Sequence, residues 1–323
     1  MLGDPPPPGP VRRYWKFAWA DLAALPVVGA VDYAPKNRGA FRMFAEGKFI
    51  GEHLEAFSAV KTRKNLPGFG NCVYCGRGHD GDGNALKLTS EHVIPEFLGA
   101  GLELREASCF DCQKATSKFE VSIAQEMFDP VRKAFALVGK EGVLKKSNFP
   151  LDIGRETTEQ EYIPLVHYPT ILVMPVLYPA STYSRRPVNA DGPFNFRLYN
   201  INADAALLQR YSLDAFSSQA IDMVRFAQLI AKIAHVYAMH HFRSSVFVPR
   251  VAEFVRTDFP REAAPPPHYL EHVGCLWQQL DGTTGNLHEI EVGRMTWNGS
   301  ARRAVRVRLF ASYGMPSYYV TVE

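Results

Sequence analysis

The sequence predicts an α+β protein, in which a small module held by paired cysteines precedes a larger mixed domain of helices and strands. Three observations favour this fold class. Two Cys-x-x-Cys pairs bracket a short hairpin-like segment, several later segments alternate apolar and polar residues, and one long segment carries an apolar stripe at helical spacing. With 323 residues, 46% of them hydrophobic, the chain can bury one large core or two modest ones.

The chain divides into three predicted regions. Residues 1–13 include a run of prolines that can form neither a helix nor a sheet ladder, and we expect a disordered leader there. Residues 14–130 are expected to form an N-terminal extension together with the cysteine module. Residues 131–323 are expected to form a C-terminal mixed α/β domain of unknown role, with residues 261–267 as its clearest internal linker.

Five elements are expected before residue 130. The first is a short apolar helix near residues 15–25, and the second is a segment of loosely helical spacing over residues 41–60. Two strands and a helix should then build the module, over residues 85–88, 102–106 and 110–128.

The predicted helix over residues 110–128 has two distinct faces. Gln113 and Glu120 fall on one face at helical spacing, and Phe119 and Ile123 fall on the other. One face can therefore look toward the preceding strand while the other packs in the core.

The C-terminal domain is expected to combine several strands with one long helix. The strongest helix runs over residues 213–242 and carries a long apolar stripe. Strands rich in β-branched and aromatic residues are expected over residues 170–178, 194–199, 288–292, 304–310 and 318–322.

Global properties leave the class of partner open. The net charge of +3 is compatible with a polyanionic partner but does not mark a strongly basic nucleic-acid binder. Four of the five cysteines form Cys-x-x-Cys pairs, the spacing typical of metal ligands, which favours a protein of the reducing cytosol over a secreted protein stabilised by disulfides. We expect Cys275 to be a buried, inert thiol. We expect a cytoplasmic protein with no membrane partner, because the chain shows neither a signal peptide nor a run of about 20 apolar residues.

The paired cysteines point to a structural zinc ion. A tetrahedral zinc site takes four thiolates, and the two pairs can deliver them across one small hairpin. Such a site has no open position for water, so any chemistry must come from residues that the zinc holds in place. The four expected zinc ligands are Cys72, Cys75, Cys109 and Cys112.

The order of these residues resembles the motif of the HNH endonuclease superfamily, also called ββα-metal or His-Me finger nucleases. The resemblance is to those members whose small fold is held together by a structural zinc ion. The resemblance covers roughly a sixth of the chain. It rests on Cys72-Val73-Tyr74-Cys75-Gly76, on Glu91-His92-Val93-Ile94-Pro95 with Leu98-Gly99, and on Ala107-Ser108-Cys109-Phe110-Asp111-Cys112 with residues 116–120 behind it.

The resemblance implies a small ββα-metal fold and roles for several residues. His92 would be the general base that deprotonates water, and Glu91 would bind the catalytic Mg²⁺ or Mn²⁺, which prefer oxygen ligands. Gln113 stands where the family has an asparagine ligand, and its amide oxygen has the same chemistry on a longer arm. Glu120 is a further candidate ligand, about 10 Å along the helix from Gln113.

One residue of the family pattern is missing. The middle asparagine, whose amide would orient the loop that carries the histidine, is expected between Leu98 and Cys109, and Gly101 or a neighbouring residue stands in its place. The change bears on the preorganisation of His92, because a general base depends on a fixed tautomer and orientation.

Positively charged residues gather in sequence around the module. Each alone is equally well explained as a solvated surface residue, but their density around one small site favours contact with a nucleic-acid backbone. The candidates are Lys61, Arg63, Lys64, Arg105, Lys114 and Lys118, with Arg77 and Lys87 nearby.

Three functional interpretations follow. The first is a metal-dependent endonuclease that hydrolyses DNA phosphodiester bonds, in a setting such as restriction or defence against foreign DNA. The second is a non-catalytic zinc module that binds nucleic acid or a protein partner, which the missing asparagine favours. In the third, the C-terminal domain is a sensor or a platform for a protein partner or a homo-oligomer, and the zinc module is its effector.

Overall fold

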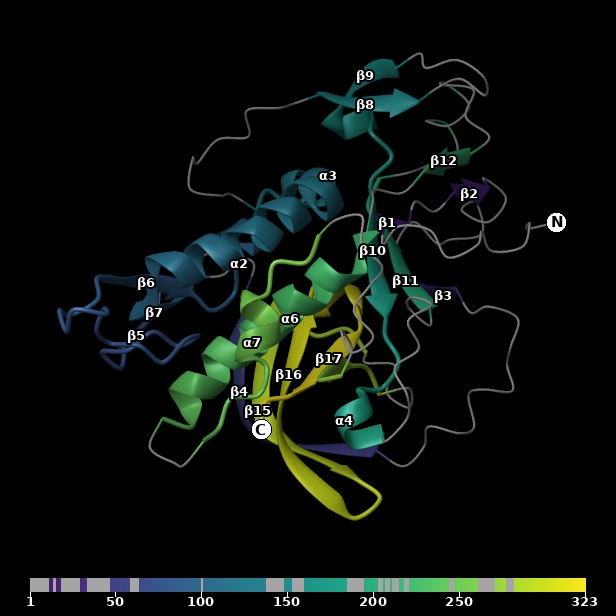
Figure 1. Cartoon of the computed structure of the whole chain (residues 1–323). Helices are drawn as coiled ribbons and strands as arrows, with labels where there is room; N and C mark the ends of the chain where they lie inside the picture. The colour runs from purple at the N-terminus through teal and green to yellow at the C-terminus, as the bar shows by residue number, and fades with distance from the viewer. Residues whose placement is uncertain are drawn as a thin grey trace.

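The computed structural model confirms an α+β fold of helices and sheets (Figure 1), whose described residues form one main apolar core and a smaller second cluster. The expected leader and the expected linker at residues 261–267 lie outside the described residues, apart from a two-residue strand at Arg12–Arg13. The structure describes residues 12–13, 16–18, 30–33, 47–58, 64–99, 101–137, 148–152, 160–184, 195–202, 206, 210, 215–217, 221–243, 247–260, 271–276 and 282–323.

A five-stranded antiparallel sheet is the largest sheet of the described chain, with the strand order β14-β17-β16-β15-β4. β15 and β16 form a tight hairpin, because Asn298 and Gly299 both adopt the positive φ that a two-residue primed turn requires. The strands are β4 (Gly47–Phe57), β14 (Val273–Gly274), β15 (His288–Trp297), β16 (Ser300–Leu309) and β17 (Ser317–Thr321).

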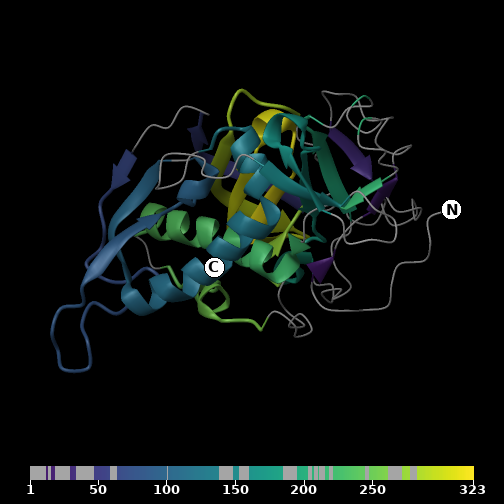
Figure 2. The ribbon, with the colours of Figure 1, turned by 90° about the horizontal axis from the view of Figure 1, so that it is seen from above.

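Helix α6 (Met223–His241) lies across this sheet and is buried along most of its length (Figures 1 and 2). Asp222 caps its N-terminus by accepting a hydrogen bond from the backbone N–H of Arg225, at 3.0 Å. The helix contacts β15, β16 and β17 on one side and α2 and α7 on the other. It therefore connects the large sheet to the cysteine module.

The cysteine module consists of a three-stranded sheet, in the order β5-β7-β6, followed by helices. β6 and β7 are antiparallel, and β7 leads without a break into α2. The chain then continues through one stretch of π-helix at Ile123–Met127. The elements are β5 (Lys64–Leu66), β6 (Leu88–His92), β7 (Leu102–Cys109), α2 (Phe110–Ser122) and α3 (Asp129–Ala134).

Shorter elements complete the described fold. A three-stranded sheet has the order β10-β11-β3, and three two-stranded pairs are β8 with β9, β12 with β2, and β1 with β13. The strands are β1 (Arg12–Arg13), β2 (Lys16–Ala18), β3 (Ala30–Tyr33), β8 (Asn148–Asp152), β9 (Gln160–Pro164), β10 (Ile171–Val176), β11 (Asn195–Asn200), β12 (Ala215–Ser217) and β13 (Ile221–Asp222). The short helices are α4 (Ser181–Ser184) and α7 (Ala252–Arg256).

Two helical expectations were wrong, and a third, the long helix over residues 213–242, was confirmed except at its start. Residues 41–60 contain strand β4, whose backbone pairs with β15, and two glycines within β4 weaken any helical tendency. Lys16–Ala18, within the helix expected near residues 15–25, is a strand paired with β12. The long helix begins at Met223, because the preceding segment includes β12 and β13. In each case pairing with a distant strand overrode the local pattern.

The expected strands of the C-terminal half are present, as β10, β11, β15, β16 and β17. The expected domain boundary near residue 130 stays a prediction. Two contacts connect the residues before this boundary with those after it: strand β4 pairs with β15, and helix α2 contacts α6. Among the described helices, none is long and apolar enough to cross a membrane.

His288 ties the large sheet to the segment that follows β6. Its Nε2 hydrogen-bonds the backbone oxygen of Leu98 at 2.8 Å, and its Nδ1 accepts from the backbone N–H of Phe310 at 3.2 Å. The side chain is fully buried, and this burial lowers the pKa of His288 to about 4. The imidazole is therefore neutral in the folded protein and holds two segments in register.

We expect His288→Gln to flatten the dependence of stability on pH. A histidine whose pKa is lowered in the folded state stabilises the fold when the pH is above its unfolded-state pKa of about 6.5. This contribution is lost as the pH falls toward the folded-state pKa of about 4. For His288 the loss is about 2 kcal/mol between pH 7 and pH 5. Glutamine offers an N–H donor and a carbonyl acceptor and does not titrate. Denaturant unfolding at both pH values measures the difference, and equal losses in wild type and variant would contradict the assignment.

Candidate functional site

The four cysteines come from a turn and from a strand–helix junction. Cys72 and Cys75 lie in a tight turn closed by a hydrogen bond from the backbone N–H of Gly76 to the oxygen of Cys72, at 2.8 Å. Gly76 has a φ of 72°, a conformation that favours glycine. Cys109 ends β7, and Cys112 lies in the first turn of α2. The continuous path from strand to helix therefore aims both thiols at the turn.

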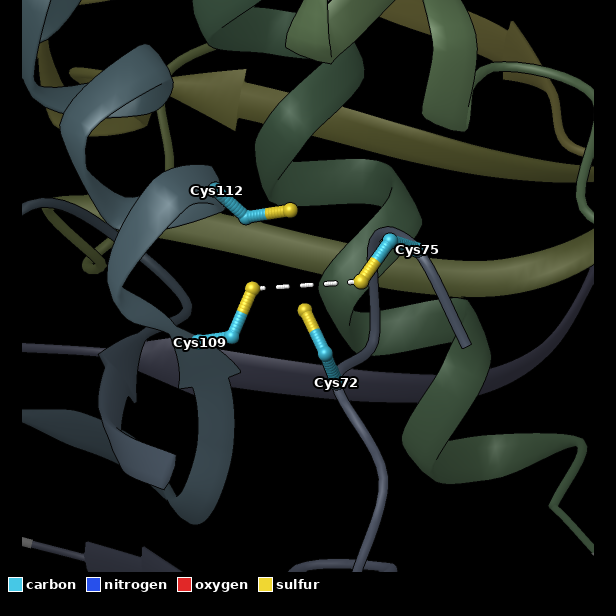
Figure 3. A group of neighbouring side chains, drawn as sticks. All are labelled: Cys72, Cys75, Cys109 and Cys112. Carbon is cyan, nitrogen blue, oxygen red and sulfur yellow. Dashed lines mark hydrogen bonds between the residues drawn. The ribbon is translucent and has the colours of Figure 1, made fainter. Parts of the chain in front are cut away.

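The four thiol sulfurs lie within 4.8 Å of one another (Figure 3). The Sγ atoms of Cys75 and Cys109 are 3.8 Å apart. A tetrahedral zinc ion with Zn–S bonds of about 2.3 Å requires sulfurs about 3.8 Å apart, so the cluster fits zinc without rearrangement of the backbone. Among the residues that the structure describes, no other group of three or more His, Cys, Asp or Glu side chains is arranged in this way.

The electrostatics of the cluster also favour a bound cation. The hydrogen bond from Cys112 lowers the pKa of Cys72 to about 4, and the same interaction raises the pKa of Cys112 far above its usual value. One thiol can therefore ionise only at the expense of its neighbour. All four can be thiolates together when a metal ion neutralises them.

Helix α6 supports the cysteine turn from the C-terminal half. The Nε2 atom of His235 hydrogen-bonds the backbone oxygen of Val73 at 2.8 Å, and its ring stacks on Tyr74 at a centroid distance of 5.6 Å. Burial lowers the pKa of His235 to about 4, so the ring is neutral and serves as a packing partner. Outside the turn, Nε of Arg77 donates to the Sγ of Cys75 at 3.5 Å.

A cavity of about 340 Å³ lies between the end of β6 and the polar face of α2. The four residues that the sequence analysis singled out for chemistry all line it: Glu91, His92, Gln113 and Glu120. Arg132 of α3 lines it too and was not singled out in the sequence. The cavity thus gathers carboxylates, an amide, an imidazole and a guanidinium.

A β-bulge sets the orientation of the Glu-His pair. The register between β6 and β7 shifts between Thr89 and Glu91, so that Glu91 is opposite Leu104 and His92 is opposite Glu103. Glu91 is buried, whereas His92 is half-buried with its Nε2 3.3 Å from Oε1 of Glu103. Burial is the main cause that lowers the pKa of His92, which favours a neutral imidazole at neutral pH.

The sequence analysis missed Lys232 of α6, which has no exposed surface. Its Nζ lies 2.8 Å from Oε1 of Glu91 and 3.0 Å from Oε1 of Glu120, and it also donates to the backbone oxygen of His92. Burial alone would lower the pKa of Lys232, but the two carboxylates outweigh it and raise the pKa above its usual value. The side chain is therefore an ammonium ion between two carboxylates.

A signal for this arrangement exists in the sequence. Arg225, Gln228, Lys232 and His235 follow one another at spacings of three and four within an otherwise apolar helix. Such spacing marks one polar face on a buried helix. All four residues are buried in the structure.

The predicted phosphate-binding cations have different environments. Lys61 and Arg63 lie outside the described residues. Lys64 pairs with Glu55 at 2.9 Å and Lys118 pairs with Asp258, so both have carboxylate partners. Arg105 and Lys114 are exposed. Among these described cations none lines the cavity, where Arg132 instead lies 3.1 Å from Asp129.

Comparisons with known proteins give no relative. The chain matches no protein-family model, no curated protein and no solved structure. The functional argument therefore rests on the cysteine cluster and on the cavity.

We expect the purified protein to contain one tightly bound zinc ion per chain. Cys72→Ser should lose the ion and lower the free energy of unfolding by more than about 3 kcal/mol, because a structural zinc contributes directly to folding. Cys275→Ala is the matched control, since that buried thiol is outside the cluster. Elemental analysis and denaturant unfolding provide the measurements. A wild-type protein without zinc, or an equal zinc loss in the control, would refute the assignment.

Proposed function

We propose that this protein is a metal-dependent endonuclease that hydrolyses phosphodiester bonds in DNA. One observation carries the proposal: Glu91, His92, Gln113 and Glu120 line a single cavity next to the four-cysteine cluster. The succession of β6, β7 and α2 supports it, since these elements bring a Glu-His pair and a polar helix face together. A hydrolase of this kind needs a base, oxygen ligands for a cation, and a cavity for the reacting phosphate.

His92 is the proposed general base. A neutral imidazole can take a proton from water, and the lowered pKa of His92 favours that form. Glu103 lies within 3.3 Å of its Nε2, where it can accept the ring N–H and fix the ring orientation. In that tautomer the lone pair is on Nδ1, which is buried and has no hydrogen-bond partner among the described residues, so catalysis would require a water molecule to enter beside it.

Glu91, together with either Gln113 or Glu120, would hold Mg²⁺ or Mn²⁺. Carboxylate and amide oxygens are the donors that hard divalent cations prefer, so the donor chemistry fits. Lys232 contacts the Oε1 atom of each carboxylate. When bound, such an ion would neutralise the phosphate and stabilise the departing oxygen.

Positive charge near the cavity would position the DNA backbone. Arg132 lines the cavity, and Arg105 and Lys114 are exposed on the same module. Cations of this kind contact phosphate without reading sequence. A role in restriction or in defence against foreign DNA, in the cytoplasm, remains part of the proposal.

A second candidate is a zinc module that binds nucleic acid or a protein partner without cleavage. The ammonium of Lys232 already balances Glu91 and Glu120. Among the described residues, the carboxylates and the imidazole at the cavity do not form a close metal-ligating group as the four thiols do. This candidate predicts bound zinc, retained nucleic acid and no second metal ion.

We expect the protein to nick supercoiled plasmid DNA in the presence of Mg²⁺ or Mn²⁺. His92→Ala should lower the rate by at least about 100-fold, which is the usual contribution of a general base. His79→Ala is the matched control, because His79 is exposed in the loop between the cysteine pairs and does not line the cavity. Nicking that persists unchanged in His92→Ala would remove this residue from the mechanism.

Binding of Mn²⁺ separates the two candidates without an activity assay. The endonuclease should bind one Mn²⁺ in addition to zinc, and Glu91→Gln should weaken this binding by more than about tenfold, because a charged ligand is lost. Glu253→Gln is the control, since Glu253 is exposed on α7. Electron paramagnetic resonance titration measures free Mn²⁺. DNA binding without Mn²⁺ binding or nicking would favour the second candidate.

A further inference from the structure

Lys232 joins three groups that belong to two different elements of the cysteine module. Its Nζ lies 2.8 Å from Glu91 and 3.0 Å from Glu120, and donates to the backbone oxygen of His92. The backbone oxygen of His92 accepts a hydrogen bond from the ammonium group, and the two carboxylates lie within ion-pair distance of it. The lysine comes from α6, outside the strands and helix that carry its partners.

The environment makes this arrangement rigid. Lys232 has no exposed surface, and the side chain of Glu91 is only 6% exposed. A buried ammonium without partners would be strongly destabilising, and so would the buried carboxylate of Glu91 without a cation, whereas the side chain of Glu120 is 23% exposed. The three groups therefore fix one another's positions.

We propose that Lys232 is a positioning residue for the reaction, holding Glu91, Glu120 and the backbone of His92 in the geometry that the cavity needs. The inference rests on the proposed function. Lys232 does not line the cavity, so it acts through its partners and does not touch the substrate.

This role accounts for a departure in the sequence. The amide expected to orient the segment that carries His92 is absent near Gly101. The hydrogen bond from Lys232 to the backbone oxygen of His92 restrains that same segment. The site is then completed by α6, and residues 64–137 do not contain all of it.

Steady-state kinetics of the full chain test the inference. We expect Lys232→Met to lower kcat by about 100-fold, because small displacements of catalytic groups have effects of that size. KM for DNA should stay the same, since Lys232 is beneath the cavity. Lys133→Met is the matched control, because Lys133 is also buried and pairs with a carboxylate, Asp129, at 2.8 Å. It should lose stability but keep its kcat.

A spectroscopic measurement decides the point even when catalysis is absent. The ring resonances of His92 in histidine-labelled protein, assigned with His92→Gln, should shift in Lys232→Met and stay in place in Lys133→Met. If Lys232→Met does not fold, the double variant Lys232→Met/Glu120→Gln takes its place, because it leaves one fewer carboxylate without its cation. The double variant is then compared with Glu120→Gln alone. Melting curves and zinc content confirm that each compared protein is folded.

The outcomes separate this inference from the proposed function. Shifted His92 resonances with a lower kcat and an unchanged KM support a positioning role. If stability falls while the His92 resonances and kcat per folded protein stay as in the wild type, Lys232 is only structural and the inference is overturned. If the wild type does not cleave DNA, the endonuclease proposal fails, and the His92 resonances alone then decide whether Lys232 positions this residue.

Discussion

Four thiol groups from two separate segments meet at one point, and the geometry of the cavity depends on that meeting. The turn at Cys72 and Cys75 precedes β6, while Cys109 and Cys112 belong to the junction of β7 and α2. Four like thiolates cannot be held this close without a cation between them. A zinc ion at their centre would fix where α2 begins, and with it the positions of Gln113 and Glu120 relative to the end of β6.

The second constraint is the polar face of α6. A helix this deeply buried normally presents only apolar residues, yet Lys232 and His235 lie on its contact with the module. His235 holds the cysteine turn through Val73, and Lys232 holds the carboxylates of the cavity. A contact built from apolar side chains alone would be tolerant of small shifts, whereas buried charges demand one geometry. The C-terminal half thus helps to define the site as well as cover it.

The parts of the fold that the sequence predicted well are those with local signals. The cysteine spacing, the alternation in β7 and the periodicity of α2 and α6 are each visible within a dozen or so residues. The strand before the Glu-His pair was expected over residues 85–88, whereas β6 runs from Leu88 to His92 and includes the pair. Gln113 and Glu120 were placed on one helix face because helical spacing requires it, and both line the cavity.

The parts that could not be predicted depend on contacts between distant segments. Nothing in residues 47–57 reveals that they pair with β15, because edge-strand pairing is satisfied by backbone groups of any sequence. Lys232 is far from Glu91 and Glu120 along the chain, so only the tertiary packing of α6 on α2 brings them together. His288 and Arg132 belong to the same class, since their partners or surroundings are defined by packing.

X-ray absorption at the zinc edge of the purified protein tests the central claim most directly, because it reports the atoms bound to the metal. The account predicts four sulfur neighbours at about 2.3 Å and no oxygen or nitrogen neighbour. A spectrum with nitrogen or oxygen ligands, or a protein that holds no zinc at all, would contradict it.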